Sequence, residues 1–198
     1  MTLTRSQFDQ ACKEFIRRDR NTGWSWKEHS HLPGFGYMER ATLLSRPLAR
    51  DTCIDCGMAL DPPDATSALP CSVDPLTCQQ YVVLSATFRV PTFYFAVYDS
   101  SGGPPVLSHI MQTSLFRRDA CEGAEATTYS LGHLGSPFPL LSFGDHPTLN
   151  TPCWYLHPCQ TGPAVDEILA AGGYTSADGV RWLEAWFMVL GSVIDLGS

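Results

Sequence analysis

Residues 154–163 are Trp-Tyr-Leu-His-Pro-Cys-Gln-Thr-Gly-Pro, and the predicted architecture is built outward from this segment. Its first three residues are apolar and typical of a strand, which the His157-Pro158 pair ends. Pro163 suits the first turn of a helix, because the N–H that proline lacks would have no partner there. The segment therefore predicts a strand that turns directly into a helix, with Cys159 in the turn.

Two amphipathic helices are predicted after this turn. The first continues at helical spacing until Gly172-Gly173. Asp178 suits the N-cap of the second, because a short carboxylate accepts the first free backbone N–H groups. The apolar side of this second helix carries Val180, Leu183, Trp186, Phe187, Leu190 and Ile194.

The N-terminal part predicts one helix and a pair of strands. Thr4 followed by Gln7 is a capping-box pattern, and apolar residues then recur at helical spacing over about residues 4–18. Alternation at residues 24–27 predicts a strand, which would pair with a second one over residues 36–44.

The middle of the chain predicts more strands and one further helix. The strongest strand patterns are residues 81–90 and 92–98, with Pro91 between them. A helix is predicted near residues 108–117 with Ser108 as its N-cap, then a loop over 123–135 and a short strand over 138–143. This order predicts an α+β fold with a mainly antiparallel sheet flanked by helices.

Residues 46–78 interrupt these patterns. They contain five prolines and little apolar periodicity, so we expect a flexible insert of about these residues in a single domain that spans residues 1–198. Four of the eight cysteines lie in this insert: Cys53, Cys56, Cys71 and Cys78. The first two form half of a zinc-ribbon pattern, but the spacing of the second two does not complete it, so we expect no metal site.

The charge of the chain disfavours nucleic-acid binding. Its 20 acidic and 13 basic residues give a net charge of −7, and the short basic runs at Arg17-Arg18 and Arg117-Arg118 fall in predicted helices. Residues 1–20 contain no apolar run typical of a signal peptide, and no stretch is long enough for a transmembrane segment. We therefore expect a cytoplasmic protein with reduced thiols.

Lysine is scarce in this chain. Only Lys13 and Lys27 occur, beside eleven arginines. Codon and lineage bias is the simpler explanation of this count. The other explanation is that an enzyme with a reactive acyl thioester gains from few lysines, because each lysine is a potential site of self-acylation.

Cys159 is the candidate nucleophile. A thiol just ahead of a helix lies near the positive end of the helix dipole, which favours the thiolate, although Asp166 and Glu167 in the expected first turn would oppose this effect. His157 is two residues away and would act as a base, as a hydrogen-bonding support or simply as a turn residue, and His146 is a second candidate neighbour. A Cys–His pair is compatible with a hydrolase or with a carrier of acyl groups, and the absence of a Gly-rich oxyanion pattern favours the carrier.

Residues 145–161 resemble a known active-site region. The run Asp-His-Pro-Thr-Leu-Asn-Thr-Pro-Cys-Trp-Tyr-Leu-His-Pro-Cys-Gln-Thr is similar to that of the autophagy-related protein ten family, the E2-like enzymes that conjugate ubiquitin-like proteins. Residues 23–26, 83–95 and 182–196 also resemble this family.

The resemblance implies a fold, a reaction and partners. The fold would be a reduced E2-like core, and Cys159 would receive the ubiquitin-like autophagy-related protein twelve as a thioester from the E1-like autophagy-related protein seven. Transfer to a lysine of autophagy-related protein five would follow, without a metal or nucleotide cofactor. His157 and Pro158 complete the motif around the cysteine.

The chain departs from ordinary ubiquitin E2 enzymes at one point. Their His-Pro-Asn tripeptide is absent, because Thr148 follows His146-Pro147. Stabilisation of the oxyanion would then come from Asn150, Tyr81 or Thr161. The alternatives to a conjugating enzyme are a Cys–His amide or thioester hydrolase and a non-catalytic E2-like binding module.

The substrate surface is expected on the strand pair at residues 81–98. Aromatic side chains crowd these strands, and alternation turns some of them away from the core. An outward ring such as Phe93 or Tyr94 would bind the protein substrate, because aromatic rings offer a large contact area at low entropic cost. The alternative is that helices cover both faces of these strands.

Overall fold

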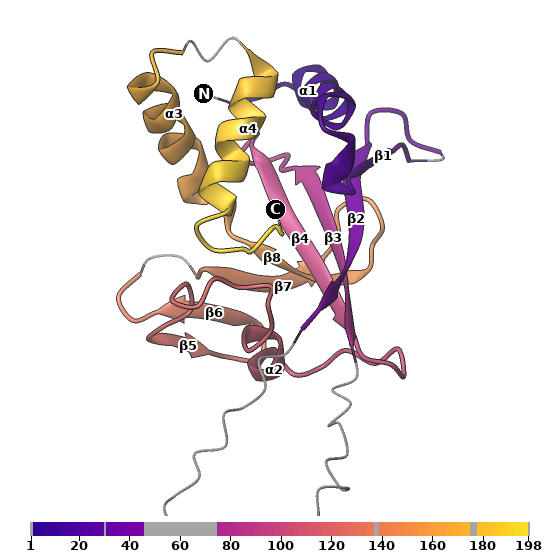
Figure 1. The fold of residues 1–198 in the computed structure, drawn as a ribbon, viewed down its shortest axis with the longest axis vertical. Coiled ribbons are helices and arrows are strands. Elements are labelled where there is room, and N and C mark those ends of the chain that lie inside the picture. Colours follow the sequence, from indigo (N-terminus) through magenta and orange to yellow (C-terminus); the bar gives the residue numbers. More distant parts are fainter. Residues whose placement is uncertain (1, 30, 46–74, 137–138, 175–177, 198) are drawn as a thin grey trace, which may run out of the picture.

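The computed structural model of the chain describes residues 2–29, 31–45, 75–136, 139–174 and 178–197. In these ranges eight strands form one sheet in the order β1-β2-β3-β4-β8-β7-β6-β5, and every neighbouring pair is antiparallel (Figure 1). The predicted α+β class is therefore confirmed. The strands are β1 (Ser25–Lys27), β2 (Tyr37–Leu44), β3 (Leu76–Leu84), β4 (Pro91–Tyr98), β5 (Ala124–Ala126), β6 (Ser130–His133), β7 (Leu141–Asp145) and β8 (Pro152–Leu156).

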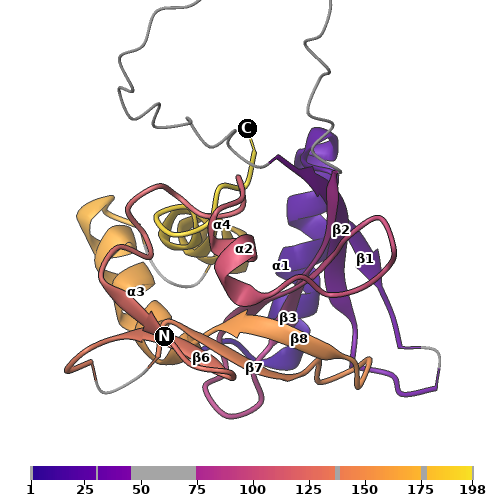
Figure 2. The ribbon, with the colours of Figure 1, turned by 90° about the horizontal axis from the view of Figure 1, so that it is seen from below.

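Three helices cover one face of the sheet. They are α1 (Arg5–Arg18), α3 (Thr161–Ala171) and α4 (Gly179–Leu190), and α4 packs between the other two (Figure 1). Seen from below, α3, α4 and α1 follow one another across the molecule (Figure 2). Phe187 of α4 stacks on Phe15 of α1 with ring centroids 4.7 Å apart. The main core lies between these helices and the sheet, and its largest fully buried side chains include Trp182, Trp186, Phe8, Phe93 and Phe95.

The helix starts predicted at Thr4 and Asp178 are confirmed. The Thr4 hydroxyl accepts the Gln7 backbone N–H, and the Gln7 side chain accepts the Thr4 backbone N–H, so the capping box is complete. The Asp178 carboxylate accepts the backbone N–H groups of Val180 and Arg181 at the start of α4. Local sequence is therefore sufficient to fix where these two helices begin.

The opposite face of the sheet carries a second, smaller cluster. Tyr37, Val83, Tyr94, Ala96 and Cys153 are buried there, and Tyr81, Tyr98 and Tyr155 pack against them. The alternation of strand side chains produces this division, because neighbouring residues of β4 point to opposite faces.

The predicted strand at residues 81–90 is wrong at both ends. β3 already begins at Leu76, so the predicted insert of residues 46–78 overlaps the first three residues of this strand. At the other end Ser85 and Val90 close a turn, in which the Ser85 N–H donates to the Val90 carbonyl over 2.9 Å. Arg89 takes a left-handed conformation in this turn, with φ of 54°. Pro91 does not separate two strands but begins β4, a position where its missing N–H costs little.

Two further predictions in the middle of the chain are wrong. The helix α2 spans only Leu107–Met111, and its N-cap is Val106 instead of Ser108. Residues 123–135, predicted as a loop, contain β5 and β6. Both strands are short and contain no β-branched residue and no Phe, Tyr or Trp, so their pattern does not stand out in the sequence. The predicted strand 138–143 is found as β7, three residues later at its start, and Phe138 lies outside the described residues.

A buried arginine joins distant parts of the chain. Arg40 of β2 is 8% exposed, and its guanidinium lies 4.6 Å from the ring centre of Trp24. It donates to the Gln80 side-chain oxygen over 2.7 Å and to the Leu196 carbonyl over 2.8 Å. A third donor reaches the Thr22 carbonyl over 3.2 Å. The Arg40 side chain therefore links β2 by hydrogen bonds to β3, to the turn before β1 and to the segment after α4.

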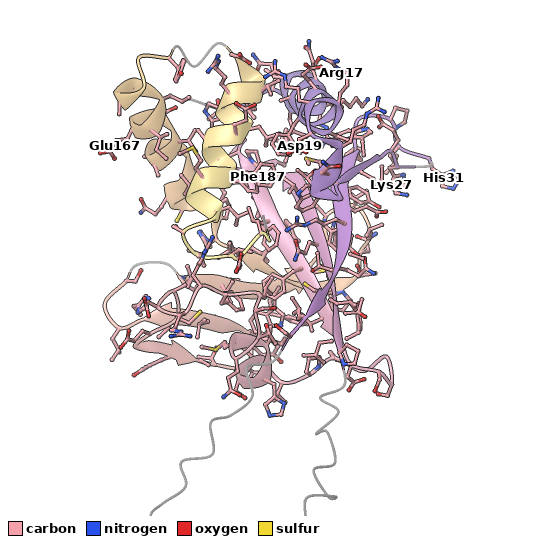
Figure 3. The ribbon with its side chains drawn as sticks, in the orientation of Figure 1. Arg17, Asp19, Lys27, His31, Glu167 and Phe187 are labelled. Carbon is pink, nitrogen blue, oxygen red and sulfur yellow. The ribbon has the colours of Figure 1, made fainter. Side chains whose placement is uncertain are left out.

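Both lysines lie at the β1 edge of the sheet. The Lys13 ammonium is 2.8 Å from the Glu28 carboxylate and 5.1 Å from the Trp26 ring centre. The Lys27 ammonium is 3.2 Å from the Glu39 carboxylate. This edge is on the opposite side of the molecule from α3, as the labels of Lys27 and Glu167 show (Figure 3).

Candidate active site

Cys159 lies in the turn between β8 and α3. The turn is a short 3-10 helix, Pro158–Gln160, which leads directly into α3 at Thr161. Pro158 is buried and Cys159 is half-buried. The strand-to-helix arrangement predicted from the sequence is thus confirmed, and it places the thiol immediately ahead of a helix N-terminus. Asp166 and Glu167 fall in the second turn of α3, not in the first as expected, because the helix begins two residues before Pro163.

His157 holds the backbone of this turn. Its Nδ1 accepts the Cys159 backbone N–H over 3.4 Å, and its own backbone N–H donates to the Leu140 carbonyl over 3.1 Å. Burial lowers the pKa of the His157 imidazole, which favours the neutral ring that this contact needs. The ring also packs edge-on against Phe88, with centroids 5.7 Å apart. Of the three roles considered for His157, these contacts favour the hydrogen-bonding support.

Thr161 also closes the turn. Its hydroxyl donates to the Pro158 carbonyl over 2.6 Å, and its backbone N–H donates to the same carbonyl. The hydroxyl proton is therefore engaged with the backbone and does not face an acyl oxygen above Cys159. Thr161 is a part of the turn that presents the thiol.

Two cavities meet at Cys159. The larger has a volume of about 330 Å³ and lies under α3 and α4. The smaller has about 200 Å³ and lies between the β3–β4 turn and the start of α3. Cys159 and Pro158 line both. The larger cavity is mostly apolar, and its walls include Phe93, Leu140, Leu156, Ala164, Trp186 and Val193.

His146, Asn150 and Tyr81 are not near Cys159. His146 follows β7 at Asp145, which pairs with Pro152 at the start of β8, whereas Cys159 follows the end of β8. The five residues of β8 separate the two positions by roughly 13 Å. Asn150 is exposed in the β7–β8 turn with φ of 52°, a conformation that asparagine tolerates. Tyr81 packs in the tyrosine cluster on the other face of the sheet and lines neither cavity beside Cys159. The oxyanion roles considered for Asn150 and Tyr81 do not fit these positions.

His146 belongs instead to the tyrosine cluster on the other face. Its Nδ1 accepts the backbone N–H groups of Thr148 and Leu149, each over 3.1 Å. The ring is fully buried, and the nearest aromatic ring is that of Tyr81, with centroids 4.7 Å apart. Burial lowers the pKa of His146 to about 4, so this histidine is neutral and holds the β7–β8 turn.

Phe93 and Tyr94 are not exposed rings. Phe93 is 1% exposed in the main core, and Tyr94 is 9% exposed in the tyrosine cluster. Both faces of β4 are covered, so the expected substrate surface on this strand is wrong. Phe93 does line the larger cavity beside Cys159. Sequence reasoning missed Phe88, which reaches the site from the β3–β4 turn that had been predicted as strand.

The remaining cysteines differ from Cys159. Cys12, Cys78 and Cys153 are buried and Cys121 is partly buried. Burial raises the pKa of all four thiols, that of Cys78 to about 12. Cys53, Cys56 and Cys71 lie outside the described residues. In the described part of the chain, no three potential ligands gather in a way that would hold a metal ion.

Replacing His157 tests whether its ring acts through the backbone. His157→Ala should slow acyl loading of Cys159 about fivefold, the effect of losing a turn-capping contact of about 1 kcal/mol. His157→Asn should retain most of the rate, because the asparagine oxygen can accept the same N–H. Loading is measured as adduct formation over time. If Asn is as slow as Ala, the ring contributes through its other nitrogen and the supporting role is wrong.

Comparison with known proteins agrees with this geometry. Residues 7–197 match the family described as autophagocytosis associated protein, active-site domain. The human ubiquitin-like-conjugating enzyme ATG10 is 24% identical over 204 residues, covering 96% of this chain and 87% of the human protein. The enzyme of the same name from Arabidopsis thaliana is 33% identical over 121 residues, 59% of this chain and 48% of its own.

The antiparallel sheet, the helices on one face and the cysteine at the strand-to-helix turn define, with these matches, an E2-like transferase of ubiquitin-like proteins. The chain belongs to the autophagocytosis-associated active-site family, among the conjugating enzymes named ATG10. Among the described residues, no helix combines the length and apolarity that a membrane crossing needs.

Proposed function

We propose that Cys159 accepts autophagy-related protein twelve as a thioester from the E1-like autophagy-related protein seven. The chain then transfers it to a lysine of autophagy-related protein five. The observation that carries this proposal is the position of Cys159, half-buried at a helix N-terminus and in the wall of two cavities. Two openings suit a carrier, because the acyl donor and the acceptor amine must both reach the carbonyl carbon that is bonded to this sulfur.

The chemistry is two acyl exchanges. In the first, Cys159 Sγ attacks the carbonyl carbon of the E1 thioester, a new C–S bond forms, and the E1 sulfur leaves. In the second, the amine of a lysine attacks the same carbonyl carbon, and Cys159 Sγ leaves. Negative charge develops on the carbonyl oxygen in both steps, and the positive end of the α3 dipole next to Cys159 would stabilise it. Neither step needs a metal or a nucleotide.

The proposal includes a cytoplasmic location. The five cysteines in the described ranges are free thiols, as a thioester carrier requires. Reducing compartments keep thiols in this state.

One incubation tests the function. The chain is mixed with the E1-like enzyme, ATP and autophagy-related protein twelve, with and without autophagy-related protein five, and separated with and without a thiol reductant. The expected result is an adduct that the reductant destroys, followed by a reductant-resistant conjugate when protein five is present. A hydrolase would turn over without accumulating an adduct, and a binding module would give neither product.

A further inference from the structure

The two cavities that meet at Cys159 differ in charge. No Asp, Glu, Lys or Arg occurs among the described residues that line the larger one. The smaller one has a single charged side chain in its described lining, that of Asp166. Its other walls include Thr2, Phe88, Val90 and Pro163. The cysteine thus separates a mostly apolar space from a smaller space that contains one carboxylate.

Helix geometry directs Asp166 toward Cys159. The 3-10 turn at Pro158–Gln160 runs directly into α3, so the two residues are almost two helical turns apart on the same face. The rise between their Cα atoms is about 10 Å. Helical side chains tilt toward the N-terminus, which shortens the gap between the carboxylate and the sulfur. Both residues line the same cavity, which agrees with this geometry.

We propose that the smaller cavity admits the acceptor lysine and that Asp166 positions its ammonium group. This inference rests on the proposed function. The carboxylate attracts the incoming cation, and the Phe88 and Val90 side chains cover the aliphatic stem of the lysine. Asp166 is therefore a positioning residue for the acceptor.

In this assignment the larger cavity accommodates the C-terminal tail of the acyl donor. Once the thioester forms, the terminal carboxylate of the donor has become an uncharged acyl group. It therefore has no charge for the protein to match, and an apolar cavity of about 330 Å³ accommodates a short peptide tail. The cavity with the carboxylate is therefore assigned to the acceptor lysine, and the mostly apolar cavity is assigned to the tail of the acyl donor.

The transfer step balances with this assignment. The ammonium held near Asp166 loses one proton to solvent and becomes a neutral amine. Its nitrogen forms a bond to the thioester carbon, and the bond from that carbon to Cys159 Sγ breaks. The nitrogen then loses a second proton, which the departing sulfur takes up. The products are an amide and the free thiol, so no oxidant or further reactant is needed.

The test compares two nucleophiles on preformed thioester. After the E1-like enzyme is removed, the discharge of the thioester is timed with free lysine, a cation, and with hydroxylamine, which is mostly uncharged at neutral pH. Asp166→Asn should load normally, discharge to lysine about tenfold more slowly, and discharge to hydroxylamine at the unchanged rate. The lost rate should appear as a higher KM for lysine, and Asp166→Glu should recover part of it.

Glu167→Gln is the matched control. Glu167 is the neighbouring carboxylate, exposed on the outer side of α3 (Figure 3), and its removal should change neither rate. Normal loading of Asp166→Asn with an undiminished lysine rate would overturn the inference, as would an equal loss with both nucleophiles, which indicates damage to the turn. Failure of the unmodified chain to form any thioester would instead overturn the proposed function, and this inference with it.

Discussion

Cys159→Ser should abolish the reductant-sensitive adduct and give an ester that survives reductant. The serine oxygen still attacks the donor carbonyl, but it leaves far less readily than sulfur when an amine attacks. Transfer to the substrate should therefore fall on the order of a thousandfold or more. The measurement is the incubation with E1-like enzyme and ATP, followed by separation with and without reductant and by treatment with alkali, which cleaves the oxygen ester.

Cys121→Ser is the control for this change. Cys121 is also only partly buried, but it lines neither of the cavities beside Cys159. This variant should load and transfer as the unmodified chain does. If Cys159→Ala conjugates at the full rate while the loss of another cysteine abolishes the adduct, Cys159 is not the acyl carrier.

Arg40→Ala should lower the stability of the fold far more than the same substitution at an exposed arginine. The substitution leaves the Gln80 side-chain oxygen and the Leu196 and Thr22 carbonyls without their donor, and it removes the cation from the Trp24 ring. Buried acceptors left without a partner cost about 1–3 kcal/mol each, so we expect a total loss of about 3 kcal/mol after relaxation and water entry. The melting temperature should fall by roughly 10 °C.

Arg17→Ala is the matched arginine control. Arg17 is on the exposed side of α1 (Figure 3), and within the described ranges it pairs only with Glu14 of the same helix. Such surface pairs contribute little, so the melting temperature should remain essentially unchanged. Equal melting temperatures for Arg40→Ala and Arg17→Ala would contradict the role given to the buried guanidinium.

The turn that carries Cys159 could be predicted because its signals are local. Pro158 and Pro163 limit the backbone, the apolar run before them favours a strand, and Gly172-Gly173 ends the helix that follows. The capping residues Thr4 and Asp178 are equally local. Each of these features depends on residues within a few positions of one another.

The β3–β4 turn could not be predicted from the same kind of signal. Residues 85–90 continue the alternation of apolar and polar side chains, and a non-glycine residue, Arg89, adopts the positive φ. Nothing in the local pattern indicates the reversal. The error extends to the active site, because this turn brings Phe88 onto His157.

The surroundings of the site depend on contacts between distant segments. Sequence alone placed His146 beside Cys159 because both are near β8, but the strand register sends them to opposite ends. Phe93 and Tyr94 were expected on an exposed face because the sequence does not show that a second tyrosine cluster covers it. Spacing along the chain indicates the nucleophile but not which groups converge on it.

The position of the two lysines restricts self-modification of the enzyme to encounters between molecules. Their ammonium groups lie at the β1 edge, and four strand spacings, roughly 19 Å, separate that edge from β8. A lysine stem of about 6 Å cannot cross this distance, so neither residue can discharge a thioester on its own Cys159. Any isopeptide on Lys13 or Lys27 must come from a second, loaded molecule. The initial rate of such a side reaction would rise with the square of the enzyme concentration, and dilution would suppress it.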